Sequence, residues 1–251
     1  MRVFWLLVRR ELGSFFTGLT GYVIIAAVLF LIGISFSSLL EVLNNGDPTD
    51  TPITDLFYQS YFFWLIFLLA SPLISMRTFA REKAQGTYET LTTAPVSDLQ
   101  IVLGKFCGVL LFYLLVWTPM LACIGVVRHY SNDVSVFNFG MIASTYLGIL
   151  LIGGVFMALG CFTSSFTRSQ ILAAIISFVM GMGLFILSYR AMYGSPGSEW
   201  WNRLLSHISL IEHMQEFVKG VVDTRFVVFY LSLIAFFLYL TLKVVESRRW
   251  R

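Results

Sequence analysis

Hydrophobic residues occur along the chain in six long, nearly uninterrupted runs, with polar and charged residues gathered between them. A helix that crosses a hydrocarbon core of about 30 Å needs about 20 apolar residues, because each residue adds about 1.5 Å. Continuous runs favour helices over a membrane barrel, whose strands alternate. The pattern therefore predicts an all-α integral membrane fold with six spans, over Leu19–Leu40, Leu56–Met76, Leu99–Val127, Phe137–Phe162, Gln170–Tyr189 and Phe226–Val245.

The composition supports a bilayer as the solvent. Hydrophobic residues make up 57% of the 251 residues and charged residues 12%, whereas a soluble domain carries roughly 25% charged residues. The net charge of +3 is too weak and scattered to indicate a nucleic-acid partner. Three cysteines, all in apolar runs, match neither a disulfide framework nor a metal site.

The distribution of basic residues predicts the orientation. Twelve Lys and Arg residues fall on the side that holds both termini and the second loop, and five fall on the other side. Because cytoplasmic loops are enriched in Lys and Arg, both termini are expected in the cytoplasm. Lys105 and Lys243 are the only charges within the runs, and each is expected to extend its ammonium group to the headgroups.

Residues 1–17 predict an amphipathic helix that lies in the membrane interface. Its apolar run is too short for a signal peptide and is interrupted by Arg9 and Arg10. The expected apolar face consists of Phe4, Trp5, Val8, Leu12, Phe15 and Phe16. A charged start to the first span is the simpler alternative. Gly18 and Gly21 allow the chain to turn into that span.

The cytoplasmic loop 77–98 contains several helix boundary signals. Met76–Gln85 is rich in helix formers and is followed by Gly86, while Thr87 is placed to cap a second short helix that must end before Pro95. Ser97 and Gln100 form a capping box for the third span. We therefore expect two short helices held rigidly between membrane spans, with a solvated, positively charged loop as the alternative.

This loop also resembles a known family. The string Glu82-Lys83-x-x-Gly86-Thr87-x-Glu89-x-Leu91, followed by Pro95-Val96 and Gly104-Lys105, is similar to the loop signature of type-2 ATP-binding-cassette (ABC) exporter permeases. The resemblance extends over the whole chain as a single permease domain, 1–251. The closing residues 246–250 are most similar to the permeases of gliding motility and of nitrous-oxide-reductase maturation.

The resemblance implies a permease subunit in a bacterial plasma (inner) membrane that exports a substrate the sequence does not identify. A separate ATPase subunit would bind ATP, so the chain itself would need no cofactor, and a second permease chain, identical or homologous, would complete the pathway beside spans two and five. The loop would be a coupling helix that docks on the ATPase. The residues implied for this contact, including one in the turn between spans four and five, are Arg77, Arg81, Glu82, Lys83, Gly86, Thr87, Glu89, Leu91 and Arg168.

Several other functions are disfavoured by missing residues. Gly104-Lys105 lacks the Ser or Thr and the upstream glycine of a Walker A motif, so the chain is not expected to be an enzyme that hydrolyses ATP. No carboxylate or histidine lies in the middle of a predicted span, which argues against an ion-coupled carrier or a membrane enzyme. An ATP-driven coupler that transports nothing, and a membrane anchor for partner proteins, remain alternatives.

The segment 190–225 before the last span is too polar to cross the membrane. Its tryptophans and its helical spacing of apolar residues predict one or two interfacial helices, which either cap a pathway or act as a simple anchor. His207 and His213 are interpreted as interfacial polar residues on the outer face of such a helix. Small residues at Gly104 and Gly108, and at Gly154 and Ala158, permit close helix contacts, including a dimer contact.

Overall fold

The computed structural model describes residues 2–44, 57–58, 60–88, 96–130, 139–192 and 207–249. In this part of the chain all regular structure is helical. The helices are α1 (Arg2–Phe16), α2 (Leu19–Asn44), α4 (Tyr61–Ser75), α5 (Arg77–Gln85), α7 (Asp98–Tyr130), α8 (Phe139–Phe166), α9 (Gln170–Met192), α11 (Leu210–Val218) and α12 (Thr224–Arg249).

The six predicted spans are confirmed as helices. Six helical segments are long and apolar enough to cross a membrane, and they coincide with the six hydrophobic runs. The second span consists of two successive helices: α4 starts at Tyr61, and α5 follows directly after the turn at Met76. The remaining spans end a few residues beyond their predicted C-terminal ends because the helices continue into the polar flanks. The predicted start of the fourth span, Phe137, lies outside the described residues.

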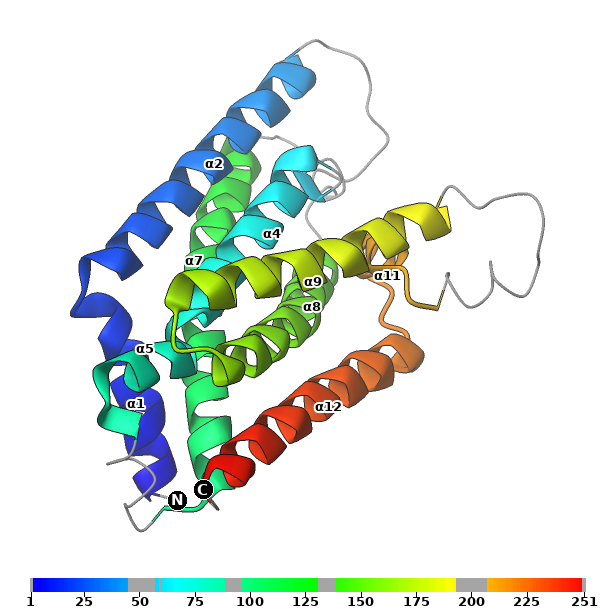
Figure 1. The fold of residues 1–251 in the computed structure, drawn as a ribbon. Coiled ribbons are helices and arrows are strands. Elements are labelled where there is room, and N and C mark those ends of the chain that lie inside the picture. Colours follow the sequence, from blue (N-terminus) through cyan, green and yellow to red (C-terminus); the bar gives the residue numbers. More distant parts are fainter. Residues whose placement is uncertain are drawn as a thin grey trace.

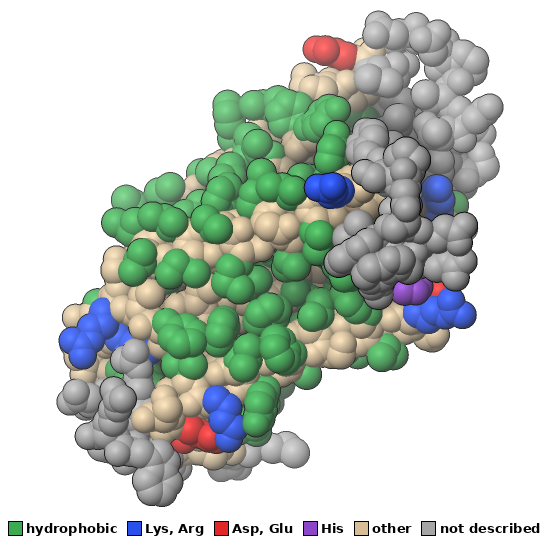
Figure 2. Space-filling view, turned by 45° about the vertical axis from the view of Figure 1, so that its right-hand side comes forward, with side chains coloured by type: hydrophobic (Ala, Val, Ile, Leu, Met, Phe, Trp, Pro, Cys, Tyr) green, Lys and Arg blue, Asp and Glu red, His purple; other side chains and the backbone are tan. Residues whose placement is uncertain are grey.

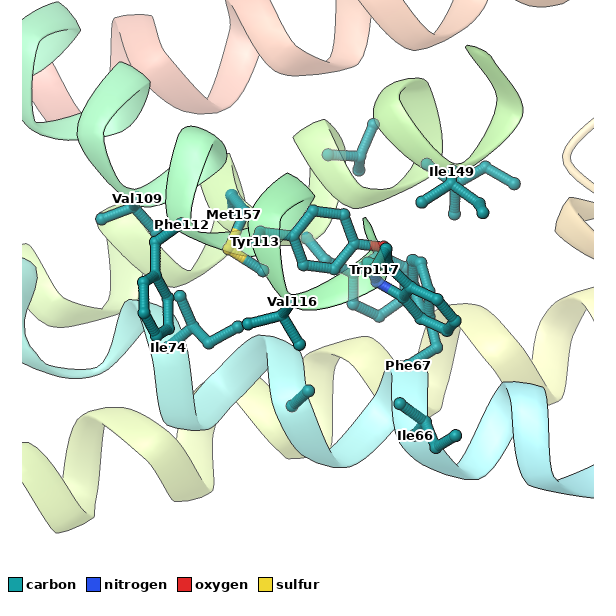
Figure 3. Packing of buried hydrophobic residues seen from close by; sticks show 14 of the residues in the cluster. Ile66, Phe67, Ile74, Val109, Phe112, Tyr113, Val116, Trp117, Ile149 and Met157 are labelled. Atoms are coloured by element: carbon teal, nitrogen blue, oxygen red, sulfur yellow. The ribbon is translucent and has the colours of Figure 1, made fainter. Parts of the chain in front are cut away.

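Two of the spans form the centre of the bundle. Most residues of α4 and α8 are buried, whereas few residues of α2, α9 and α12, which surround them, are buried. Aromatic rings fill the space between α4, α7 and α8: Figure 3 shows Phe67, Tyr113 and Trp117 close together, and the Tyr113 ring lies 6.1 Å from that of Phe67. Gly153 on α8 provides room for Tyr113, because a Cβ there would overlap the ring.

Pro119 interrupts the hydrogen bonding of α7 without ending the helix. A proline has no N–H, so the carbonyl four residues earlier, that of Leu115, loses its helical donor. The Thr118 hydroxyl donates to this carbonyl at 2.7 Å. The carbonyl that Pro119 frees is therefore satisfied by a neighbouring side chain.

The bundle has two chemically distinct ends, which we name the α5 end and the α11 end. Figure 1 shows the N-terminal end of α1, helix α5 and the C-terminal end of α12 together at one end, and α11 at the other. Figure 2 shows hydrophobic side chains over the middle of one face, with the charged side chains gathered toward the two ends. This arrangement is typical of a chain that crosses a bilayer.

The predicted N-terminal helix is present as α1, but it packs more tightly than an interfacial helix requires. Val8 and Phe15 are buried, and Phe15 stacks on Phe112 of α7 with ring centroids 4.1 Å apart. Trp5 remains 65% exposed and is available to lipid. The turn after α1 needs Gly21, because a Cβ there would overlap the carbonyl oxygen of Phe15.

Candidate functional site

Helix α5 begins and ends as its sequence predicts. Good helix formers continue to Gln85, and Gly86 follows with a φ of 74°, a left-handed conformation that favours glycine. Thr87 and Tyr88 start another helical turn, and the rest of the predicted second helix lies outside the described residues. The first half of the expected two-helix loop is thus confirmed.

The start of α5 is held by a serine from another span. The Ser164 hydroxyl of α8 accepts hydrogen bonds from the backbone N–H groups of Phe79 and Ala80, both at 3.0 Å, and donates to the Met76 carbonyl at 2.9 Å. The first N–H groups of a helix have no intrahelical partner, so a hydroxyl at this point acts as a cap. Lys83 also donates to the Ser165 carbonyl, which ties both ends of α5 to α8.

A buried ion network joins α5 to α1 and α7. The Lys105 ammonium group lies 3.0 Å from Glu82 Oε1, 3.3 Å from Glu11 Oε2 and 2.7 Å from the Thr78 carbonyl oxygen. Arg10 approaches the same oxygen of Glu82 at 2.5 Å, so two cations balance two carboxylates. Lys105 is only 1% exposed, which makes the network costly to open because Lys105 and Glu11 would lose their partners away from water.

The prediction that Lys105 reaches the headgroups is therefore wrong. Its side chain points into the protein because Glu11 and Glu82 supply opposite charges there, which the sequence does not place beside it. Lys243 does remain at the surface, 2.8 Å from Glu246.

The two glycines on either side of Lys105 allow α1 to pack closely against α7. A Cβ at Gly104 would lie 3.0 Å from the Cβ of Leu7, and one at Gly108 would lie 2.7 Å from the Cβ of Glu11. The predicted close approach at these glycines is confirmed, but its partner is α1 of the same chain. Gly154 likewise faces Ile234 of α12 rather than another copy.

Arg77 is also used within the protein. Its guanidinium group lies 4.9 Å above the Phe15 ring, donates to the Thr20 hydroxyl and reaches the Ser14 carbonyl at 3.2 Å. Because the side chain is 6% exposed, it holds the turn between α1 and α2 and offers little charge to a partner.

The predicted coupling residues thus separate into two groups. Arg77 and Glu82 face inward, while Gly86 and Thr87 are exposed together with Ala84 and Gln85, which the resemblance did not assign. We call residues 84–87 the α5 corner. Arg81 and Lys83 are half-buried at its edge, and Arg168 is exposed in the turn that follows α8. Glu89 and Leu91 lie outside the described residues.

Sequence reasoning missed that Glu11, Lys105 and Ser164 hold α5, although Lys105 belongs to the loop signature and Ser164 to the turn between spans four and five. The available signals were an acidic residue within an otherwise basic N-terminal helix and a lysine placed between two glycines four residues apart. Neither signal indicates which residue the charged side chain contacts. The capping serine gave no signal, because it lies 85 residues from the amide that it accepts.

At the α11 end, the interpretation of His213 as a residue on the outer face of a helix is wrong. Its side chain is 1% exposed, its ring stacks on Phe226 at 3.9 Å, and its Nδ1 lies 2.8 Å from the Tyr230 hydroxyl. Burial lowers the pKa of His213 to about 4, assisted by the nearby His207 and opposed by Asp223. The imidazole is therefore neutral at physiological pH. Within the described residues, no group of three or more metal-ligating side chains occurs.

Six apolar spans, a charged helix at one end and a buried ion network define a multi-pass membrane protein with one specialised, polar end. Residues 42–243 match the model of the ABC-2 family transporter proteins, and the chain belongs to this family. No curated protein matches the chain. Members of the family are permease subunits of ABC transporters and normally have no enzymatic activity of their own. They are embedded in the lipid bilayer and work with a partner ATPase.

Proposed function

We propose that the α5 corner docks on a separate cytoplasmic ATPase subunit, and that the chain couples ATP hydrolysis there to export of a substrate across a bacterial plasma membrane. The observation that carries this proposal is the way in which neighbouring helices hold α5 in place. The helix is capped by α8, joined to α1 and α7 by buried charges, and exposed only toward its C-terminal end.

This attachment of α5 to α1, α7 and α8 suits the transmission of force. A partner that pushes on the α5 corner displaces α5, α1 and the start of α7 together, because separating them would leave buried charges without partners. A structural anchor has no need for this rigidity. The proposed orientation places the α5 end, with its excess of basic residues, in the cytoplasm.

The proposal includes a second permease chain beside α4 and α9. Along Tyr61–Ser75 the exposed residues are Tyr61, Leu65, Leu69 and Leu73, one on every fourth position of a helix that is otherwise largely buried. This stripe is a suitable contact for the partner permease that the family resemblance implies. Disulfide formation by Leu69→Cys in membranes, but not by Phe30→Cys on α2, would support it.

Co-purification from native membranes in mild detergent tests the coupling proposal. The wild-type chain should bring down a stoichiometric subunit with a Walker A motif, and Gln85→Arg at the α5 corner should lose it. Val221→Arg, an equivalent change at an exposed residue of the α11 end, is the matched control. Glu82→Arg is a poor test, because it breaks the buried ion network as well as any contact. Recovery of the Gln85→Arg chain with its ATPase at full yield would contradict the proposal.

The same experiment separates a plain anchor, but not a non-transporting coupler, from the proposed function. A coupler that transports nothing would still bind the ATPase through the α5 corner, so it differs only in whether substrate crosses the membrane. A plain anchor would show no ATPase in any preparation. The orientation is tested by labelling Ala84→Cys with an impermeant reagent: the residue should be protected in intact cells and labelled after lysis.

A further inference from the structure

A groove between α7 and α12 lies outside the machinery described above. Its volume is about 320 Å³, and its walls are entirely hydrophobic or aromatic side chains, among them Leu99 and Val102 of α7 and Leu231, Ala235, Tyr239 and Leu242 of α12. Figure 1 shows the C-terminal end of α12 beside the start of α7 at the α5 end. The groove is thus located where two spans meet near one membrane surface.

The groove is open along one side. Val102 forms its floor and is 2% exposed, whereas Leu99, Leu231 and Tyr239 at its rim are each more than half exposed. These rim residues belong to membrane-spanning segments, so the open side faces the hydrocarbon region. An unfilled apolar groove would lose van der Waals contacts along its whole length, so some apolar group occupies it in the membrane.

The length and the volume of the groove indicate what occupies it. From Leu231 to Leu242 the lining extends for about 16 Å along α12, roughly half the thickness of a bilayer core of about 30 Å, and therefore one leaflet. A helix with side chains is about 10–12 Å in diameter. A space of about 320 Å³ has room for a single polymethylene chain, whereas a helix of a second copy could place only side chains in it.

A charged group stands at the end where a headgroup would lie. Lys243 directly follows Leu242, and its Nζ lies 5.5 Å from the ring centroid of Tyr239, a wall residue. The Lys243 side chain is 53% exposed, and Nζ also lies 2.8 Å from Glu246 Oε2. Because an ammonium group has three donors, the pair with Glu246 leaves donors for a phosphate oxygen.

We propose that this groove is a binding site for one anionic glycerophospholipid from the leaflet at the α5 end. One acyl chain lies along α12 from Leu242 to Leu231, and Lys243 contacts the headgroup phosphate. The inference requires only that the chain spans a membrane, and it does not depend on the ATPase; only the identity of the leaflet as cytoplasmic rests on the proposed orientation. Since lipid tails are as apolar as the leucines of the walls, preference for this lipid comes from shape and from Lys243.

Native mass spectrometry of the purified chain, titrated with phosphatidylglycerol, tests the site. The wild-type chain should bind one molecule more tightly than any further ones, and more tightly than phosphatidylcholine with the same acyl chains. Ala235→Trp, which fills the groove, should weaken this binding at least tenfold. Lys243→Ala leaves the groove open and should weaken it about fivefold while abolishing the preference for phosphatidylglycerol.

Two matched variants serve as controls. Ser232→Trp adds the same ring to an exposed residue of α12 that does not line the groove, and Lys219→Ala removes the same charge at the α11 end. Both should bind phosphatidylglycerol like the wild type. Equal binding by the wild type, Ala235→Trp and Lys243→Ala would overturn the proposal. So would a dimer that Ala235→Trp dissociates without change in lipid binding, because the groove would then belong to a second copy.

Discussion

At the α5 end, α1, α5 and α7 are joined by buried charges, whereas at the α11 end neutral hydrogen bonds and aromatic rings hold the helices together. Lys105 contacts two carboxylates from two other helices. At the α11 end, Ser144 donates to the Phe217 carbonyl at 2.6 Å, and Ser188 accepts from the Leu210 N–H at 3.1 Å. Both ends are well buried, so the difference is one of chemistry and not of packing.

The difference indicates which end is able to move as one unit. Breaking a buried ion pair leaves an uncompensated charge and costs about 3–5 kcal/mol, while a neutral hydrogen bond contributes a net 0.5–1.5 kcal/mol or so. Helices at the α5 end are therefore expected to stay together when pushed. Helices at the α11 end adjust at lower cost, which suits a region that responds to a motion started elsewhere.

The largest expected effect comes from removing the centre of the ion network. Lys105→Met leaves the buried Glu11 without a cation, while Glu82 keeps Arg10, and should destabilise the protein by about 3–5 kcal/mol. Thermal unfolding in mild detergent should show a midpoint lower by more than about 6 °C. Lys243→Met, which breaks an exposed pair, should leave the midpoint unchanged; equal effects of the two changes would contradict the buried network.

Acid should weaken the α11 end through His213. Between pH 6.5 and pH 4 the imidazole of His213 is protonated in the unfolded chain but not in the folded one. The free energy of unfolding therefore falls as the pH falls through this window. The loss amounts to at most about 3 kcal/mol. His213→Phe should therefore lose less stability than the wild type between pH 7.5 and pH 4.5, measured by thermal unfolding, whereas the exposed His207→Phe should retain most of the acid sensitivity.

A smaller steric change should weaken the contact between α1 and α7 without altering any charge. Gly108→Ala places a methyl group against Glu11, and the required shift should cost about 1–3 kcal/mol. Gly125→Ala in the same helix meets no atom within 4 Å and should be neutral or slightly stabilising. If both changes stabilise the protein in thermal unfolding, α1 does not pack on α7 as described.

The smallest expected effect concerns the cap of α5. Ser164→Ala removes the acceptor for two backbone N–H groups and should cost about 0.5–2 kcal/mol. Hydrogen exchange of the amides at Phe79 and Ala80 should accelerate, while the amides of α11 keep their protection. Faster exchange at both ends would mean that the cap stabilises the bundle generally and not α5 in particular.

Features that depend on local sequence were predictable. The six spans follow from apolar length, and the end of α5 follows from Gly86, since each signal lies in adjacent residues. The environments of Lys105 and His213 were not predictable, because whether a polar side chain faces lipid or protein depends on partners distant in the sequence. For the same reason Glu82 was assigned to a partner surface, although it faces Lys105.

Site-specific photo-crosslinking in native membranes tests the central claim most directly. A photoreactive residue at Gln85 should crosslink to a polypeptide that carries a Walker A motif, and the same residue at Val221 should not. Crosslinks of this ATPase to position 221 but not to position 85, or no ATPase crosslink from position 85 in membranes that contain the intact complex, would contradict the account.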